Sequence, residues 1–196
     1  SGRVTRFRHD RAGPKSLSDD RIYVLFEDRD AALWVGTNGG LNRIDPATGE
    51  CTRFVHDPAD PGSLSDDRVD RKSEDETDRL DVGGRGSGQN LLDRATGTFT
   101  RFRHDPRDPS SLSDDRVRAI LQDQAGRLWV GTTGGLNLRD EGGRFARYRH
   151  DPADPSSLGD DHVMSLFQDR GGVLWVGTRS GGVNKWNPLT WQFGHH

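Results

Sequence analysis

The chain has 196 residues, of which 30% are hydrophobic and 30% are charged, with 28 Lys and Arg against 31 Asp and Glu. The net charge of −3 gives no basic stripe for nucleic acid, and the longest apolar run, Ile22 to Phe26, is far shorter than the roughly 20 residues of a membrane span. A single cysteine, Cys51, excludes an internal disulfide, and no Cys/His spacing predicts a zinc site. We therefore expect a soluble segment with no nucleic-acid partner, no membrane segment and no cofactor.

A sequence motif recurs four times along the chain at intervals of 46 to 48 residues. Each copy contains a Ser-Leu-(Ser/Gly)-Asp-Asp segment, and a His-Asp pair recurs with the same spacing. The leucines are Leu17, Leu64, Leu112 and Leu158, and the histidines are His9, His56, His104 and His150. Two independent markers with one period indicate an internal repeat.

The first copy contains four short segments with the composition of β-strands. They are rich in β-branched and aromatic residues, and clusters of Gly, Pro, Asn and Asp separate them. The predicted strands are Ile22 to Glu27, Leu33 to Thr37, Leu41 to Ile44 and Cys51 to His56. No stretch combines helical periodicity with helix caps, so each copy is predicted to form a meander of four antiparallel strands.

A period of about 45 residues with four strands per unit is typical of a β-propeller blade. The tryptophans of the recurring Leu-Trp-Val segment (Trp34, Trp129 and Trp175) are predicted to pack between blades rather than to bind a ligand. The sequence thus predicts an all-β protein of β-propeller-type blades, forming a single propeller or half-propeller over residues 1–196. Blades are expected at about residues 16–56, 63–104, 111–150 and 157–193, with residues 3–8 as an extra outer strand.

The second copy departs from this pattern in its inner half. Where the first copy has Tyr-Val-Leu-Phe at residues 23–26, the second has Asp-Arg-Lys-Ser at residues 70–73, and Asp81 replaces Trp34. Losing these five buried apolar side chains, at roughly 1.5 to 3 kcal/mol each, would cancel the net stability of a typical domain. The second blade is therefore predicted to be degenerate: its inner strands are displaced, or covered by a partner, or were altered after the parent protein evolved.

The copies match three motifs in order, with departures such as Ala31 and Cys51 in the first copy. The motifs are Ser-Leu-Ser-Asp-Asp-x-Val, Asp-x-x-Gly-x-Leu-Trp-Val-Gly-Thr-x-x-Gly-Gly-Leu-Asn-Arg and Asp-Pro-x-Thr-Gly-x-Phe-Thr-Arg-Phe. With them the chain resembles the two-component regulator propeller repeats, strongly in copies 1, 3 and 4 and weakly over residues 69–89. The resemblance implies an extracytoplasmic sensor segment of a bacterial hybrid histidine kinase or diguanylate cyclase. In such proteins seven-bladed propellers pass a ligand signal inward, so the resemblance also implies a periplasmic or extracytoplasmic location.

The polar residues that occur in every copy do not identify a catalytic site, because a repeated residue cannot mark one special environment. The Asp-Asp pairs, such as Asp19-Asp20, are predicted to cap turns, and the repeated histidines are predicted to be solvated or bonded to turns. The acidic run of Glu74 to Glu76, with Asp78 and Asp81, lacks the spacing of a calcium loop and is predicted to be solvated. No metal site is therefore expected.

Two loops of each blade are expected to open on one face, near the central channel. The loop entering the inner strand supplies Arg21, Arg68, Arg116 and His162, and the loop between the second and third strands supplies Asn38, Arg85, Thr133 and Arg179. Together these residues would form a cationic rim for an anionic small molecule or sugar, since guanidinium groups bind such oxygens bidentately. The alternative is that the arginines pair with neighbouring aspartates.

Three functions follow from these features, and we expect the first. The chain is a non-catalytic ligand-sensing or interaction fragment of a propeller, or a self-assembling scaffold without a ligand, or a propeller lyase or hydrolase that uses His162 and the acidic run. Five segments can serve as an outer strand although four blades need only four. Because Val4 to Arg8 and Thr190 to Phe193 compete for the edge of the fourth blade, we expect a homodimer that closes by exchanging the first of them.

Overall fold

The computed structural model describes residues 2, 4–28, 30–74, 80–84, 86–187 and 192–195. Within these residues the chain forms four antiparallel sheets of four strands each, and each sheet is a meander in chain order. The predicted all-β architecture of four-stranded blades is confirmed. No helix long and apolar enough to span a membrane occurs in the described part of the chain.

The four sheets are blades 1 to 4. Blade 1 comprises β1 (Ile22–Glu27), β2 (Leu33–Thr37), β3 (Gly40–Ile44) and β4 (Cys51–Phe54), and blade 2 comprises β5 (Arg71–Glu74), β6 (Leu80–Gly83), β7 (Gln89–Asp93) and β8 (Thr98–Phe102). Blade 3 comprises β9 (Val117–Gln122), β10 (Leu128–Thr132), β11 (Gly135–Arg139) and β12 (Phe145–Tyr148). Blade 4 comprises β13 (Val163–Gln168), β14 (Leu174–Thr178), β15 (Val183–Asn187) and β16 (Gln192–His195).

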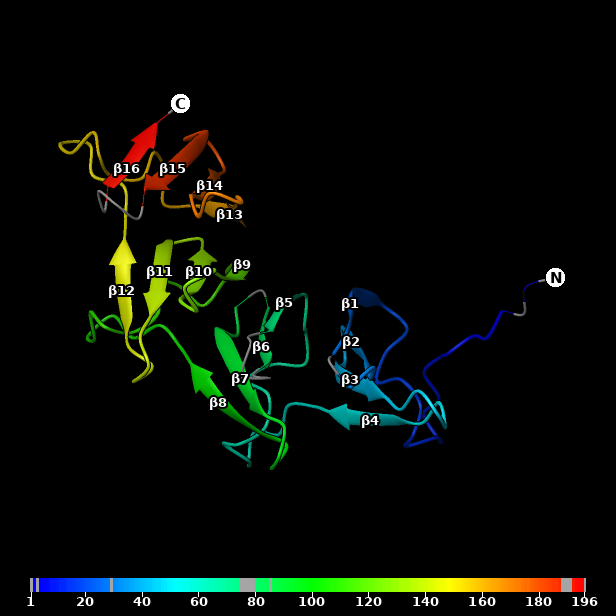
Figure 1. Cartoon of the computed structure of the whole chain (residues 1–196). Helices are drawn as coiled ribbons and strands as arrows, with labels where there is room; N and C mark the ends of the chain where they lie inside the picture. The colour runs from blue at the N-terminus through cyan, green and yellow to red at the C-terminus, as the bar shows by residue number, and fades with distance from the viewer. Residues whose placement is uncertain are drawn as a thin grey trace.

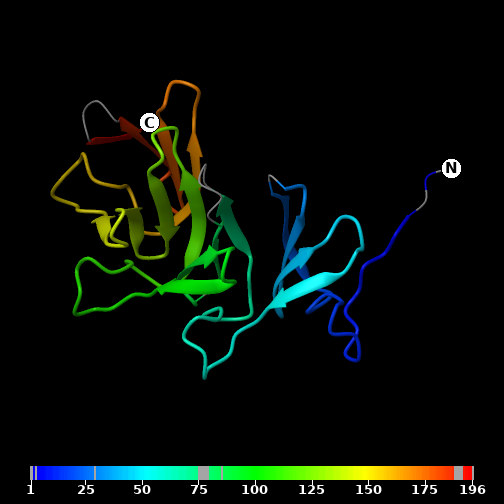
Figure 2. The same ribbon diagram turned by 60° about the horizontal axis from the view of Figure 1, so that its bottom comes forward.

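The blades follow one another along an open arc, with the first strand of each blade on the inner side (Figure 1). The inner strands β5, β9 and β13 are direct neighbours across the blades. Blades 1 and 4 lie at opposite ends of this arc, and the two termini are far apart in both views (Figure 2). The inner strands of blades 2, 3 and 4 therefore form one continuous concave surface.

The predicted extra outer strand falls on residues 3–8, of which residues 4–8 are described. Residues 4–8 are extended but belong to none of the sheets, and they lie at the blade 1 end of the arc. A strand needs a free edge within reach, and the outer edge of β15 is at the other end, where β16 pairs with it. Within the single chain, blades 1 and 4 therefore do not meet, and the outer strand of blade 4 is described over Gln192–His195, since residues 188–191 lie outside the described residues.

The Asp-x-x-Gly-x-Leu-Trp motif builds the turn between the first two strands and fixes the tryptophan. In each of three blades the indole N–H donates to the carboxylate of the aspartate six residues earlier, and the same aspartate accepts backbone N–H groups of the turn. The indole distances are 2.7 Å for Trp34 and Asp28, 2.8 Å for Trp129 and Asp123, and 2.9 Å for Trp175 and Asp169. The motif thus satisfies the one polar atom of a side chain that packs between blades.

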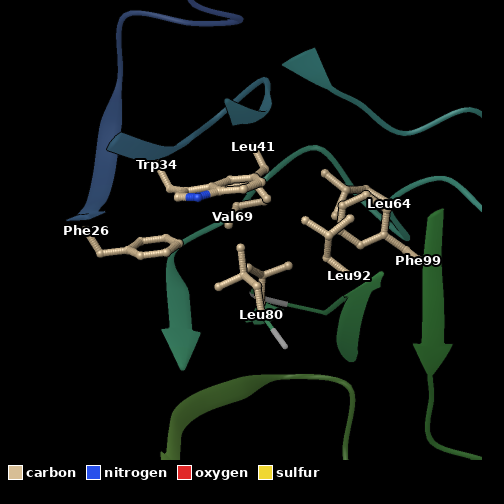
Figure 3. Close-up of a cluster of buried hydrophobic side chains, with 9 residues drawn as sticks. Phe26, Trp34, Leu41, Leu64, Val69, Leu80, Leu92 and Phe99 are labelled. Carbon is tan, nitrogen blue, oxygen red and sulfur yellow. The ribbon is translucent and has the colours of Figure 1, made fainter. Parts of the chain in front are cut away.

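Successive residues of the Leu-Trp-Val segment point to opposite faces of a blade. We call the face that carries the tryptophan the Trp face, and the face that carries the leucine and the valine the Leu face. The Trp face of one blade packs against the Leu face of the next blade. Figure 3 shows the first of these contacts, where Phe26, Trp34 and Leu41 of blade 1 meet Leu80 and Leu92 of blade 2. The same relation joins blade 3 to blade 4, where the ring centroids of Trp129 and Trp186 are 4.9 Å apart. The predicted role of the tryptophans between blades is confirmed at both contacts.

The glycine after Leu-Trp-Val lets the blades approach closely. A Cβ built on Gly131 of blade 3 would lie 2.5 Å from Cγ1 of Val163 in blade 4, and one built on Gly36 would lie 2.7 Å from the carbonyl oxygen of Val69. Any side chain at these positions would therefore push the next blade away.

The repeated histidines and Asp-Asp pairs hold the loops between blades. In each copy the histidine ring Nδ1 contacts the carbonyl oxygen of the Ser-Leu leucine at 2.6 to 2.7 Å, and its backbone N–H donates to the second aspartate. The first aspartate accepts the backbone N–H two residues later in every copy. Their prediction as turn-bonded and turn-capping residues is confirmed.

Blade 2 keeps the ordinary strand positions despite its polar sequence. Strands β5 and β6 pair in regular antiparallel register, with Ser73 opposite Asp81. The prediction that these strands are displaced is therefore wrong, although residues 75–79 and 85 lie outside the described residues. Buried Asp81 accepts a hydrogen bond of 2.8 Å from Arg139 in blade 3 and another from Gln89.

This ion pair replaces an apolar contact of the other blades. Arg139 lies opposite the leucine of its Leu-Trp-Val segment, as Leu92 does in blade 2 and Trp186 in blade 4. Asp81 stands at the position of Trp34, and Arg139 stands at the position of Leu92. The contact between blades 2 and 3 therefore has an ion pair where the contact between blades 1 and 2 has a tryptophan and a leucine, which explains how blade 2 packs without its tryptophan.

Candidate functional site

The two loops predicted to share one face do meet in blades 1, 3 and 4. The backbone N–H of the second-loop residue donates to the carbonyl oxygen of the first-loop residue, at 3.1 Å in blade 1, 3.2 Å in blade 3 and 2.9 Å in blade 4. These pairs are Asn38 with Arg21, Thr133 with Arg116, and Arg179 with His162. Arg85 lies outside the described residues.

Three of the predicted arginines have local partners. The guanidinium groups of Arg21 and Arg116 bind the aspartates two residues before them, at 3.2 Å and 3.0 Å. Arg68 stacks over the Tyr23 ring of blade 1, 4.6 Å from its centroid, and its Nε lies 3.4 Å from Asp70. For Arg21 and Arg116 the alternative of pairing with neighbouring aspartates is therefore the observed one.

A cationic cluster forms where blades 3 and 4 meet at the inner side of the arc. Burial lowers the pKa of His162, the positive charges of Arg118 and Arg179 lower it further, and the nearby carboxylate of Asp160 only partly opposes them, with a smaller lowering effect from Arg116. The histidine and the three arginines come from the inner strand and both loops named above. Because its pKa lies below the ordinary value, His162 is mostly neutral at pH 7.

Two arginines of this cluster have no acidic partner among the described residues. The Nε of Arg118 is buried without a hydrogen-bond partner, and the Arg179 side chain is exposed. From blade 2, Arg71 donates to the carbonyl oxygen of Arg118 and so adds a further positive charge at the neighbouring inner strand. The cluster thus holds donors that an anion could use.

The carboxylates beside the cluster are already bonded to their own loops. Burial raises the pKa of Asp114, but hydrogen bonds from Arg116 outweigh this effect and hold the pKa at about 2. Backbone and side-chain hydrogen bonds from His162 and Ser180 lower the pKa of Asp160. Both groups are therefore charged at neutral pH and order the loops on which the basic residues lie.

Arg118 and Arg71 were not among the residues predicted from the sequence. They lie on inner strands, whereas only loop residues were considered. The sequence did contain a signal for Arg118, because this position differs in every copy and is Tyr23, Asp70 or Met164 in the other three. A position that differs in every repeat cannot serve the common packing and is free to serve a local role.

Of the side chains in the enzyme alternative, the structure describes those of His162 and Asp81, and these two are kept apart. Asp81 is buried between blades 2 and 3 and bonded to Arg139, so it is not available to His162. Most of the acidic run lies outside the described residues. Within the described part of the chain, no group of three His, Cys, Asp or Glu side chains could hold a metal ion.

A cavity of about 630 Å³ lies elsewhere, between the outer half of blade 2 and the β11–β12 turn of blade 3. Leu91, Phe102, Arg94, Arg139 and Glu141 are among its lining residues. Its walls mix both signs of charge with apolar side chains and contain none of the predicted site residues.

The architecture is that of a β-propeller. The chain is similar to the extracellular domain of the hybrid two component system BT3049 from B. thetaiotaomicron, with a TM-score of 0.73 and 23% identity over 96% of this chain and 23% of that one. The extracellular domain of BT4673 from the same organism gives a TM-score of 0.69 and 21% identity, over 95% and 22% of the two chains. Virginiamycin B lyase from Staphylococcus aureus gives 0.62 and 12%, over 89% and 55%.

At these identities the likeness establishes the fold alone, and the chain spans less than a quarter of the length of the two extracellular domains. No curated protein matches the chain in sequence. The family model of the two component regulator propeller matches residues 16–39, 111–134 and 157–180, which lie in blades 1, 3 and 4. The chain therefore carries two-component regulator propeller repeats.

Proposed function

We propose that this chain is part of a non-catalytic sensor propeller and binds an anionic small molecule or sugar at the inner ends of blades 3 and 4. The observation that carries this proposal is the cluster of Arg118, Arg179 and His162, in which the two arginines lack an acidic partner among the described residues. A carboxylate or sulfate would accept hydrogen bonds from the guanidinium groups and relieve their mutual repulsion. The family and the extracellular structures support a sensor located outside the cytoplasm.

The proposal is tested by titration calorimetry with glucuronate and inorganic sulfate, with glucose as the neutral control. We expect the charged probes to bind and glucose not to bind. Replacing Arg118→Gln or Arg179→Gln should weaken binding by about 10- to 100-fold, because each removes a charge-assisted hydrogen bond of roughly 1.5 to 3 kcal/mol. Arg107→Gln, on an exposed outer loop, is the matched control. Equal affinity for glucose, or equal loss in the control, would contradict the proposal.

The affinity should also depend on pH through His162. Its pKa is lowered in the free protein by burial and by the neighbouring arginines, and a bound anion would raise it. Binding therefore takes up protons, and the affinity should increase as the pH falls from the histidine pKa of the complex to the lower pKa of the free protein. His162→Gln should abolish this increase while leaving binding at pH 8 largely unchanged. A pH profile that is the same in both proteins would exclude His162 from the site.

The scaffold alternative predicts no affinity for any of these probes. It is favoured by the open ends of the arc and is distinguished from the sensor by the same titration.

A further inference from the structure

The Trp face of blade 4 exposes apolar side chains whose equivalents inside the arc are buried. Phe167 is 63% exposed, whereas Phe26, at the same position of blade 1, is 7% exposed. Val183 is 47% exposed, whereas Leu41 and Leu136 at the equivalent position are fully buried. This face has the composition of a contact between blades and no blade of the chain covers it.

The Leu face of blade 1 has the matching defect. Ile22 is 40% exposed, but its equivalents Val69, Val117 and Val163 are at most 2% exposed because each packs against the Trp face of the preceding blade. Leu25, three residues along the same strand, is 59% exposed. Blade 1 therefore exposes a Leu face of the kind that covers the Trp face at the other blade contacts.

The amino-terminal segment lies where the outer strand of a preceding blade would lie. The ring of Phe7 is 3.3 Å from a Cβ built on Gly49 of blade 1, as the ring of Phe54 is 3.6 Å from one built on Gly97 of the following blade. Its sequence also fits, since residues 4–10 read Val-Thr-Arg-Phe-Arg-His-Asp and residues 99–105 of blade 2 read Phe-Thr-Arg-Phe-Arg-His-Asp. The outer strand of blade 4, Gln-Phe-Gly-His, departs from this pattern.

We infer that the Leu face of blade 1 docks on the Trp face of blade 4 of a second copy, head to tail. Residues 4–8 of the first copy then supply the outer strand of that blade, in the place that β16 holds in the single chain. The contact repeats one already present in the molecule, with Ile22 over Gly177 as Val163 lies over Gly131. Such a contact is heterologous, and two copies that make it twice close a ring of eight blades.

The chemistry of the two faces favours a second copy. Trp175 on blade 4 would lie beside Ile44, an apolar residue that lies opposite Leu33 and that Leu17, Val35 and Cys51 of the same chain already help to bury. This pair corresponds to Trp34 with Leu92, and it contains none of the charges that distinguish the contact between Asp81 and Arg139. The Leu face of blade 1 is therefore complementary to the Trp face of blade 4. Neither of these two faces matches the faces of blades 2 and 3 that carry Asp81 and Arg139.

The test uses two variants of the whole chain, Ile22→Asp and Phe167→Asp, with light scattering over a range of concentrations. The wild type should have the mass of a dimer, and each variant alone should dissociate at least about 30-fold more readily, as expected for loss of a hot-spot residue. Mixing the two variants should restore the dimer, because the intact Trp face of one meets the intact Leu face of the other. Val55→Asp is the control, since the equivalent Arg103 and Arg149 are exposed in blades with neighbours on both sides.

Three results would overturn the inference. They are a wild type that stays monomeric at all concentrations, a variant that dimerises as well as the wild type, as pairing of like faces would predict, and a mixture of the two variants that remains monomeric. Circular dichroism of each variant tests whether it is folded. We expect both variants to fold, because the Ile22 and Phe167 side chains are 40% and 63% exposed in the single chain. A chain lacking residues 1–8 should dimerise more weakly than the full chain, and unchanged association would exclude the strand exchange.

Discussion

Two substitutions that look disruptive when taken singly compensate each other across a blade contact. Asp81 and Arg139 are 1% and 9% exposed, and each stands where another blade has an apolar residue. Gln89, at the position of Leu41 in blade 1, donates to the same carboxylate. A buried ion pair of this kind adds little to stability compared with an apolar pair of equal size, yet losing one partner is costly because the other charge stays buried.

The single substitution Asp81→Trp should therefore lower the free energy of unfolding by about 3 to 5 kcal/mol, although it restores the residue of the other blades. Restoring the whole set, with Asp81→Trp, Gln89→Leu and Arg139→Leu together, should leave stability unchanged or raise it by about 1 to 4 kcal/mol. Urea denaturation of the three single variants and the combination measures the coupling. Additive effects of the single changes would show that the three side chains act independently.

Ala31 has a backbone conformation that other blades reserve for glycine. Its φ of 60° is left-handed, and the equivalent residues Gly126 and Gly172 have φ of 78° and 82°. Because a Cβ is unfavourable in this region, Ala31→Gly should stabilise the protein by about 0.5 to 1 kcal/mol. Gly126→Ala is the matched opposite and should destabilise by a similar amount. Thermal unfolding of both variants checks the sign, and a loss of stability in Ala31→Gly would contradict it.

At the scale of the blade, the strands were predictable because their signals are local. The β-branched run of Ile22 to Phe26 and the Leu-Trp-Val-Gly-Thr segments appear as strands at the predicted residues. Blade 2 was misjudged because Asp81 was compared with Trp34 alone, whereas its partner lies 58 residues away in the next repeat. Aligning Arg139 with Leu92 would have revealed the pair.

The candidate site was predictable only in part. Loop positions such as His162 and Arg179 follow from the propeller pattern, and the structure brings the loops of each blade together. The contribution of Arg118 depends on how neighbouring inner strands face each other, which the spacing of a single repeat does not determine.

The glycine of Leu-Trp-Val-Gly-Thr should be required wherever another blade follows. Gly131→Ala places a methyl group 2.5 Å from Val163, so blades 3 and 4 must separate, at a cost of about 1 to 3 kcal/mol. Gly142→Ala, in an exposed turn where the nearest atom is a flexible carboxylate at 3.4 Å, should cost much less. Denaturation midpoints of the two variants test the difference, and equal midpoints would show that the contact relaxes freely.

Over the whole molecule, the middle blade contact differs from the other two by its buried ion pair. The first contact buries Trp34 against Leu92 and the last buries Trp129 against Trp186, whereas the middle one adds Asp81 and Arg139 to an apolar cluster in which Phe102 packs against Phe145. Repeat proteins are stabilised by each unit and by its contacts with adjacent units, and a buried ion pair adds less than an apolar pair of equal size, so we expect the middle contact to open first.

The middle ion pair consequently divides the chain into two cooperative halves. Blades 1 and 2 should exchange their amide hydrogens as one group and blades 3 and 4 as another, with an opening at the junction that precedes global unfolding. Asp81→Ala should make this opening more frequent without changing the protection inside either half, as measured by native-state hydrogen exchange. A single exchange class across all four blades would show that the arc unfolds as one unit. A propeller segment built in this way could lose one pair of blades and keep the other folded, so its smallest autonomous piece is two blades long.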